Sequence, residues 1–266
     1  MSAMKPLKFL AIIWALGFSF IFVSRSQAAT TSHEVQQKFS EANAAYRKGD
    51  YSNAQKIYEG IIQQGWESGP LYYNLANSYF KRGEIGEAVL NYERSSRLIP
   101  RDPDLKANSH YVRSLIDSNL FFPENSFVEQ LMLPWEWHME FYTLNEIAMM
   151  LVILVALLAI VHMSGIYLQW PKRLRSMAFG FLFGVFCVFA TSFMVKMNHE
   201  QNMAMAIVPT MAHFEPRDDA TVHFDLKEGN HVKILKASGI WWKVKRPDGK
   251  MGWIPQKDLQ EVEPQG

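Results

Sequence analysis

Two long apolar runs lie in the middle of the chain, between two parts of mixed polarity. Residues 147–168 contain no charged side chain, and neither do residues 177–195. At about 1.5 Å of rise per residue, helices of these lengths span a hydrocarbon core of roughly 30 Å. Only residues 169–176 join the two runs. We therefore predict two transmembrane helices, 147–168 and 177–195, that form a hairpin around a short loop.

A third apolar segment, Phe9–Val23, lies near the N-terminus and follows Lys5 and Lys8. This order is typical of a secretory signal peptide. Ser26 and Ala28 are small residues at the −3 and −1 positions, so we expect residues 1–28 to be removed after Ala28. The alternative is an uncleaved N-terminal membrane anchor.

The loop between the two spans is basic and predicts the orientation of the hairpin. Lys172, Arg173 and Arg175 lie within it, and short loops rich in Lys and Arg stay on the cytoplasmic side. A signal peptide would independently export the N-terminal part. We therefore expect a two-pass protein of the bacterial inner (cytoplasmic) membrane. Both flanking parts would be outside the cytoplasm, in the periplasm of a diderm cell.

The first flanking part, 33–118, contains a repeat of 34 residues. The segments "ANAAYRKGDYSNAQKIY" and "ANSYFKRGEIGEAVLNY" align Gly49 with Gly83 and Tyr58 with Tyr92. A glycine between two helical patterns, with alanines at constant positions, resembles the tetratricopeptide repeat. We predict all-α helical repeats at 34–67 and 70–102, a capping helix at 104–117, and a linker or interfacial segment at 119–146.

In tetratricopeptide arrays the first helix of each repeat lines a concave face, which predicts a peptide groove. Asparagines would hydrogen-bond the main chain of a bound peptide, while aromatic and basic residues would take its side chains or its terminus. The predicted groove residues are Asn43, Tyr46, Tyr73, Asn74, Asn77, Phe80, Lys81 and Asn108. The alternative is that they only pack and cap the repeats.

The second flanking part, 206–263, has short apolar runs separated by turn signals, which predicts an all-β domain. The succession "WWKV", "DG" and "GWIP" resembles the bacterial Src-homology-3-like barrels. That resemblance places Trp241, Trp253 and Pro255 at a peptide groove, whereas period-two alternation turns Trp242 and Val244 to the opposite face. A tyrosine typical of polyproline-binding relatives is replaced by Asp258, which argues against proline-rich ligands. Core packing of the tryptophans is the alternative to a protein or cell-wall contact.

Small residues recur on one face of the second span, at Gly180, Gly184, Cys187 and Thr191. Such a face allows helix backbones to approach closely. It would pack against the first span or against a transmembrane helix of a partner. His162 lies within the first span, either as a functional ionisable group or as a neutral, hydrogen-bonded side chain.

Composition excludes several classes of function. Lys and Arg number 27 against 26 Asp and Glu, so there is no overall basic field for nucleic acid. Cys187 is the single cysteine, and no nucleotide loop, GxSxG or HExxH motif is present. We therefore predict no enzyme activity, no cofactor and no metal. A weaker alternative is Cu(I) binding by Met194, Met197, Met203 and Met205 around His199.

The order of these modules resembles the BatE-type tetratricopeptide proteins of the Bacteroides aerotolerance (Bat) operon family. The resemblance rests on the export signal, the segment "YYNLANSYFKRGEIGEAVLNYERSSRLIPRDPD", the membrane hairpin and the terminal barrel. It implies membrane partners with von Willebrand factor A domains, a MoxR-type ATPase on the cytoplasmic side, and a role in tolerance of oxidative or envelope stress.

Together these patterns predict a multidomain membrane protein that acts as a non-enzymatic scaffold or adaptor. The alternatives are a peptidoglycan-binding module that recruits an envelope enzyme and a copper or redox sensor.

Overall fold

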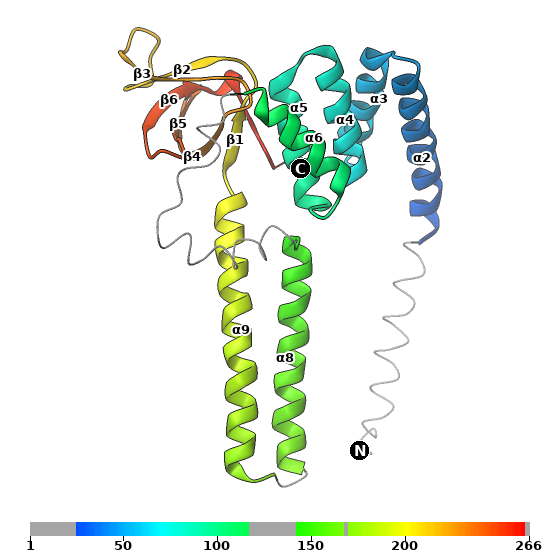
Figure 1. Ribbon diagram of the computed structural model, residues 1–266, viewed down its shortest axis with the longest axis vertical. Coiled ribbons are helices and arrows are strands. Elements are labelled where there is room, and N and C mark those ends of the chain that lie inside the picture. The colour runs from blue at the N-terminus through cyan, green and yellow to red at the C-terminus, as the bar shows by residue number, and fades with distance from the viewer. Residues whose placement is uncertain (1–24, 117–141, 168–169, 264–266) are drawn as a thin grey trace, which may run out of the picture. The chain divides into compact units, whose positions relative to one another are not determined.

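The computed structural model describes residues 25–116, 142–167 and 170–263 (Figure 1). Within these ranges the chain forms seven α-helices and a seven-stranded antiparallel sheet, which confirms the predicted combination of helical and β architecture. Two compact units are separated between Trp66 and Glu67. Most of the predicted signal peptide and most of the segment 119–146 lie outside the described residues.

The first unit contains a helix pair, α2 (Arg25–Arg47) and α3 (Tyr51–Gln63). Gly49 adopts φ +82° in the turn, and Asp50 caps α3 by accepting a hydrogen bond from the Asn53 N–H. The Tyr58 hydroxyl donates to Asn43 Oδ1 across the pair, at 2.6 Å. Helix α2 begins nine residues before the predicted repeat (Arg25 against residue 34).

The second unit opens with a matching pair, α4 (Gly69–Arg82) and α5 (Ile85–Leu98). Gly83 adopts φ +83° in the turn, and the Tyr92 hydroxyl donates to Asn77 Oδ1 at 2.6 Å. Both the turn and the hydrogen bond recur 34 residues after their counterparts, so the sequence period corresponds to a repeated structural unit. The predicted capping helix is α6 (Pro103–Ser114), whose N-terminus Asp102 caps.

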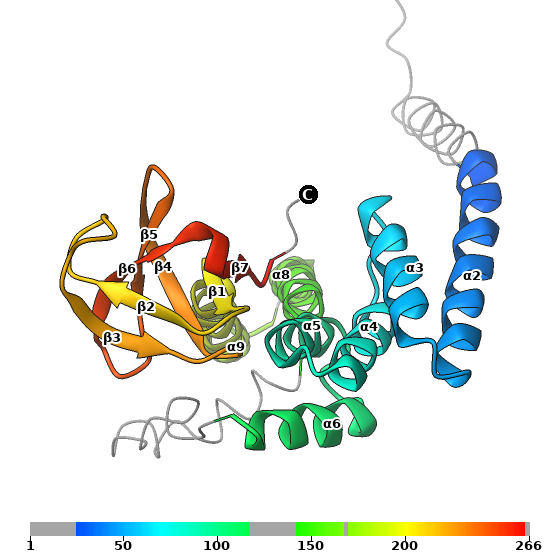
Figure 2. The same ribbon diagram turned by 90° about the horizontal axis from the view of Figure 1, so that it is seen from above.

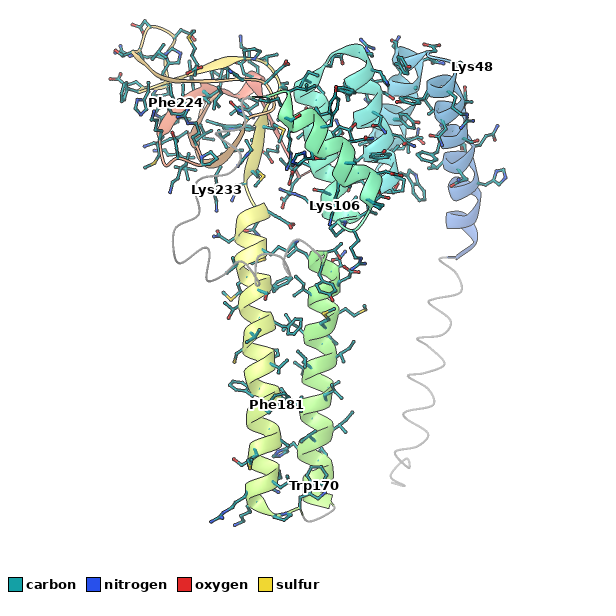
Figure 3. The ribbon with its side chains drawn as sticks, viewed as in Figure 1. Lys48, Lys106, Trp170, Phe181, Phe224 and Lys233 are labelled. Atoms are coloured by element: carbon teal, nitrogen blue, oxygen red, sulfur yellow. The ribbon has the colours of Figure 1, made fainter. Side chains whose placement is uncertain are left out.

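Two long helices follow, α8 (Leu144–Tyr167) and α9 (Lys172–Glu200), and both are long and apolar enough to cross a membrane. They lie side by side and antiparallel, with Trp170 at the loop end (Figures 1 and 3). Helix α9 begins at Lys172 rather than at 177. Lys and Arg are good helix formers, so the basic residues extend the helix instead of forming a loop.

The sheet contains seven strands in the order β3-β2-β6-β5-β4-β1-β7. The strands are β1 (Met203–Ala206), β2 (Thr210–His213), β3 (Val222–Leu226), β4 (His231–Ser238), β5 (Trp241–Lys245), β6 (Met251–Pro255) and β7 (Leu259–Glu261), with a 3-10 turn at Gln256–Asp258. Gly249 adopts φ +89° in the β5–β6 hairpin at the predicted Asp-Gly turn. Trp242 and Val244 belong to the buried core of the sheet, on the face that alternation predicts.

A second hydrophobic core joins α4–α6 to the sheet within the second unit. Met205 and Val262 of the sheet domain are buried together with Val89, Val112 and Ile116 of the helices. Figure 2 shows α5 next to β1 and β7. Helices α4–α6 and the sheet domain therefore share one core and do not form two independent domains.

Candidate interaction surfaces

The predicted helical groove residues of the second unit meet in a hydrogen-bond network. Asn108 Nδ2 donates to the Tyr73 hydroxyl at 2.7 Å and lies 3.4 Å from Asn77 Oδ1. Asn77 Oδ1 also accepts from the buried Tyr92 hydroxyl. Helices α4, α5 and α6 all contribute residues to this network, so hydrogen bonds within the unit hold these side chains in position. The asparagines thus have a structural role whether or not a ligand binds beside them.

One edge of the same face remains available to a partner. Phe80 contacts Tyr111 edge to face, with ring centroids 5.9 Å apart, and Tyr111 is 57% exposed. Lys81 is exposed next to them, and Asn74 is half-buried. The accessible part of this face is therefore Lys81 and Tyr111, together with the half-buried Phe80.

In the first unit, the two predicted groove residues are also used within the helix pair. Asn43 accepts the hydrogen bond from Tyr58, and Tyr46 packs edge to face on Tyr51 with ring centroids 5.1 Å apart. Both Asn43 and Tyr46 are half-buried.

Strand register brings the three predicted barrel residues onto one face of the sheet. Trp241 pairs with Pro255, and Trp253 pairs with both Lys243 and His213. Trp241 is only 6% exposed and packs edge to face on His213, with ring centroids 5.6 Å apart. Trp253 and Pro255 are half-buried, so they form the accessible part of this surface.

Asp258 has a structural role in the sheet domain. Its carboxylate accepts a hydrogen bond from the Thr210 hydroxyl at 2.7 Å, and its carbonyl accepts from the Ile207 N–H at 3.1 Å. These bonds join the 3-10 turn to the segment around β1 and β2.

The small-residue face of α9 does not pack against α8. A Cβ added at Gly180 or Gly184 would meet nothing within 4 Å, and Cys187 is exposed. Thr191 is also exposed and donates its hydroxyl to the Cys187 carbonyl. Within the described chain, this stripe is therefore open to lipid or to another helix.

Three arginines that the sequence analysis did not single out connect the helices to the rest of the second unit. Arg94 Nε donates to the Val262 carbonyl at 3.0 Å, and burial lowers the Arg94 pKa from its ordinary value. Arg97 Nη2 donates to the Glu200 carbonyl, the last of α9, at 3.2 Å. Arg94 and Arg97 lie three residues apart on α5, whereas Arg101 follows the end of this helix, and no local sequence pattern indicates their distant partners.

Arg101 makes the corresponding contact to α8. Its Nη2 lies 2.6 Å from Glu146 Oε1, and this hydrogen bond lowers the Glu146 pKa. Thr143 and Glu146 form a reciprocal capping box at the start of α8: Thr143 N–H donates to Glu146 Oε2 at 2.9 Å, and Glu146 N–H to Thr143 Oγ1 at 3.2 Å.

Lys233 makes a further contact at the end of α9 (Figure 3). Its ammonium donates to the Asn198 carbonyl at 2.8 Å and to Asn198 Oδ1 at 3.1 Å. Cations at a helix C-terminus complement the macrodipole. The start of α8 and the end of α9 are thus both hydrogen-bonded to residues of the other helices or of the sheet in the second unit.

Two of the four methionines named for copper binding, Met203 and Met205, pack inside the second unit. Met205 is buried in the shared core, and Met203 lies against it, with its sulfur 3.6 Å from Arg97 Nη2. Met194 is 64% exposed on α9, and the side chain of His199 lies outside the described residues. Among the described residues, no group of three or more His, Cys, Asp or Glu side chains is arranged to hold a metal.

Neither a protein-family model nor the sequence of a curated protein matches this chain.

Proposed function

We propose that the protein is a non-enzymatic scaffold anchored in the inner membrane and belongs to a Bat-type envelope complex. In this proposal the α2–α6 region is a tetratricopeptide array, the sheet is a Src-homology-3-like barrel, and both lie outside the cytoplasm. The repeated Asn–Tyr hydrogen bonds 34 residues apart and the Trp–Pro strand pairing support these two fold assignments.

The attachment of the second unit's helices to both membrane helices carries the proposal. Arg101 bonds to Glu146 at the start of α8, and Arg97 bonds to the Glu200 carbonyl at the end of α9. A module that only needed a membrane tether would require neither contact. Held at two points, the helical face and the sheet keep a defined orientation to the bilayer, as presentation to another membrane protein requires.

In this proposal the partners are membrane proteins with von Willebrand factor A domains, as the resemblance to the Bat family implies. The exposed Lys81 and Tyr111, with the half-buried Phe80, would bind an extracytoplasmic segment of such a partner. The open Gly180–Gly184 face would pack against its transmembrane helix. A MoxR-type ATPase in the cytoplasm would face only the short loop before Lys172. Its coupling to this protein would therefore run through the membrane partner.

Photo-crosslinking in intact cells tests the proposal. A photoreactive residue replaces Phe80 on the helical face and, in a second variant, Gly184 on the membrane face. Matched controls place it at Lys106, exposed on α6 away from the groove, and at Ile153, exposed on α8. We expect one membrane protein to be captured from both test positions and from neither control. No adduct at Phe80 or Gly184, or equal capture at the controls, would contradict the scaffold.

A peptidoglycan-binding barrel is the alternative that a specific observation favours. Trp253 and Pro255 form a half-buried, accessible apolar surface, and Ile240 nearby in the β4–β5 turn is 72% exposed. Because the sheet domain shares its core with α5 and α6, the test uses the full chain. The measurement is retention of the protein on purified peptidoglycan. Loss of this retention in Trp253→Ala, but not in the control Phe80→Ala, would support this alternative over the scaffold.

A further inference from the structure

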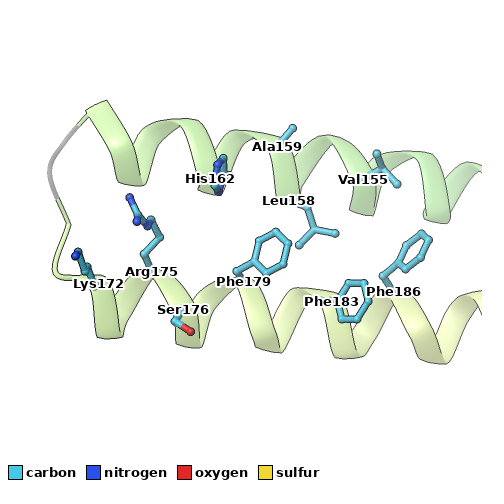
Figure 4. Close-up of a pocket in the computed structure, with 10 residues that line it drawn as sticks. All are labelled: Val155, Leu158, Ala159, His162, Lys172, Arg175, Ser176, Phe179, Phe183 and Phe186. Atoms are coloured by element: carbon cyan, nitrogen blue, oxygen red, sulfur yellow. The ribbon is translucent and has the colours of Figure 1, made fainter.

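A cavity opens between α8 and α9 at the loop end of the hairpin (Figure 4). Its volume is about 670 Å³, which is within the range of small-molecule sites, roughly 300–1,000 Å³. The lining residues are Val155, Leu158, Ala159, His162, Lys172, Arg175, Ser176, Phe179, Phe183 and Phe186. Every one of them comes from the two membrane helices.

Polar and apolar lining residues are segregated along the cavity. His162, Lys172, Arg175 and Ser176 lie toward the loop, whereas the phenylalanines and Val155 lie deeper along the helices (Figure 4). Phe179 and Phe183 stack with ring centroids 6.2 Å apart. One end therefore offers hydrogen-bond donors and positive charge, and the other end offers an apolar channel. A ligand that fills it must itself be amphiphilic.

The charge of the ligand follows from the polar end. Lys172 and Arg175 are cations, His162 carries an N–H donor in either neutral tautomer, and none of the ten lining residues is a carboxylate. The cations also lie in the first turn of α9, where the macrodipole opposes positive charge. Their position therefore does not serve the stability of the helix. Charge complementarity selects an anion.

We propose that this cavity binds one anionic glycerophospholipid, with the phosphate at Lys172 and Arg175 and an acyl chain along Phe179, Phe183 and Phe186. Basic pockets between transmembrane helices on the cytoplasmic side suit such head groups. The inference rests on the proposed membrane anchoring, since the loop end of the hairpin then lies at the cytoplasmic leaflet. The lipid fills the space between the helices and couples the hairpin to leaflet composition.

Native mass spectrometry of the delipidated full-length protein in a non-ionic detergent tests this site. The probes are dioleoyl phosphatidylglycerol and, at equal concentration, dioleoyl phosphatidylethanolamine. We expect selective retention of one phosphatidylglycerol. Arg175→Gln weakens that retention about fivefold, on the basis of about 1 kcal/mol for each cation near an anionic head group. Arg173→Gln removes the same charge at a residue outside the cavity and changes the retention of phosphatidylglycerol by less than about twofold.

Two further arms separate a lipid from a free anion. Ala159→Trp fills the cavity without changing its charge and abolishes retention of phosphatidylglycerol, whereas Ala156→Trp on the same helix, outside the lining, preserves it. Millimolar inorganic phosphate displaces no more lipid than chloride of equal ionic strength. Displacement by phosphate alone, equal retention of the two lipids, or equal effects of the two arginine variants would each overturn the proposal.

The same preparation distinguishes failure of the lipid site from failure of the scaffold. Resistance of the protein to extraction from membranes with alkaline carbonate is measured first. A protein that is released refutes the anchoring on which both proposals rest. A protein that stays in the membrane and is captured at Phe80, yet does not prefer phosphatidylglycerol, refutes the lipid site alone.

Discussion

Arg94 on α5 donates two hydrogen bonds to the main chain of Glu261 and Val262, which lie 167 and 168 residues further along the chain. The guanidinium bonds to the Glu261 carbonyl at 2.8 Å and to the Val262 carbonyl at 3.0 Å, and it lies 5.7 Å from the centroid of the Tyr72 ring. One half-buried side chain of α5 thus bonds to the end of the last strand. Because of this contact and the shared hydrophobic core, the stability of helices α4–α6 and the stability of the sheet depend on each other.

Replacement of Arg94 tests that dependence. Arg94→Leu leaves two carbonyls of the last strand without these donors, and hydrogen bonds to charged groups contribute about 1.5–3 kcal/mol. We expect the free energy of unfolding to fall by about 2–3 kcal/mol, measured by chemical denaturation of the full chain in detergent with tryptophan fluorescence. The control is Arg82→Ala, which removes a partly exposed ion pair with Glu84 and should cost less than about 1 kcal/mol. Equal costs would contradict the role of Arg94.

Gly86 tests the same junction through a steric effect. A Cβ at Gly86 would lie 2.8 Å from the Ile207 carbonyl oxygen and 2.9 Å from its Cα, and these backbone atoms cannot rotate away. Gly86→Ala should therefore destabilise the protein by about 1–3 kcal/mol, as overpacking does. Gly60→Ala in α3 meets nothing within 4 Å and should instead stabilise its helix by about 0.5–1 kcal/mol. Opposite signs in denaturation experiments are the expected result.

The features that could be predicted from the sequence are those with a local or periodic signal. The 34-residue spacing of Gly49 and Gly83 marks two helix turns that the structure contains, and the Asp-Gly pair at 248–249 marks a hairpin. The two apolar runs correspond to α8 and α9. Each of these signals comes from residues that are close together in the sequence or that repeat at a fixed spacing, so it can be recognised without knowledge of distant contacts.

Contacts between distant segments had no such signal. No local pattern pairs Arg94 with Val262 or requires a glycine opposite Ile207. Met203 and Met205 looked like potential soft ligands in the sequence, but β1 turns them into the core that the sheet shares with α5. The interpretation of Asn77 as a ligand-binding residue omitted its hydrogen bond to Tyr92, because a residue type does not reveal whether its partner is internal.

Asn77 and Lys81 separate internal packing from ligand binding on the helical face. Asn77→Ala removes the acceptor of the Tyr92 hydroxyl and a neighbour of Asn108, and it should destabilise the chain by about 1–2 kcal/mol. Lys81→Ala changes an exposed residue and should alter stability by less than about 0.5 kcal/mol. If the face binds a partner, Lys81→Ala lowers the crosslinking yield from Phe80. An unchanged crosslinking yield would mean that the helical face serves only in packing and binds no partner.

The β5–β6 hairpin should contribute stability that depends on pH. Arg246 Nε donates to Asp248 Oδ1 at 3.0 Å, and this pairing lowers the Asp248 pKa from 3.8 to about 2. Because the folded-state pKa is the lower one, the stabilisation is complete above pH 3.8 and is lost as the pH falls toward 2. Solvent screening of this partly exposed pair limits it to about 1 kcal/mol or less.

Acid titration of stability checks this window. Asp248→Asn should lower the free energy of unfolding at pH 7 and flatten its decline below pH 4, whereas Asp218→Asn, which removes an exposed carboxylate of the same domain, should not. Denaturant midpoints measured between pH 2 and pH 7 provide the comparison. An Asp248→Asn profile parallel to the wild-type profile would show that the ion pair is fully screened.

The proposed topology predicts which positions a membrane-impermeant maleimide reaches in intact spheroplasts. Cys187 is the only cysteine, so Cys187→Ser provides a background without thiols. In that background, Asp218→Cys in the sheet domain should be labelled without disruption of the membrane. Arg173→Cys at the loop end of the hairpin should be labelled only after permeabilisation, since Lys172 and Arg175 keep the start of α9 basic. Arg173 lies near the start of α9, a helix of 29 residues and about 40 Å, and the sheet domain that contains Asp218 follows the end of this helix. Labelling of both in intact spheroplasts would mean that the hairpin does not span the bilayer. The reverse pattern would place the helical array and the sheet in the cytoplasm and would contradict the proposed topology.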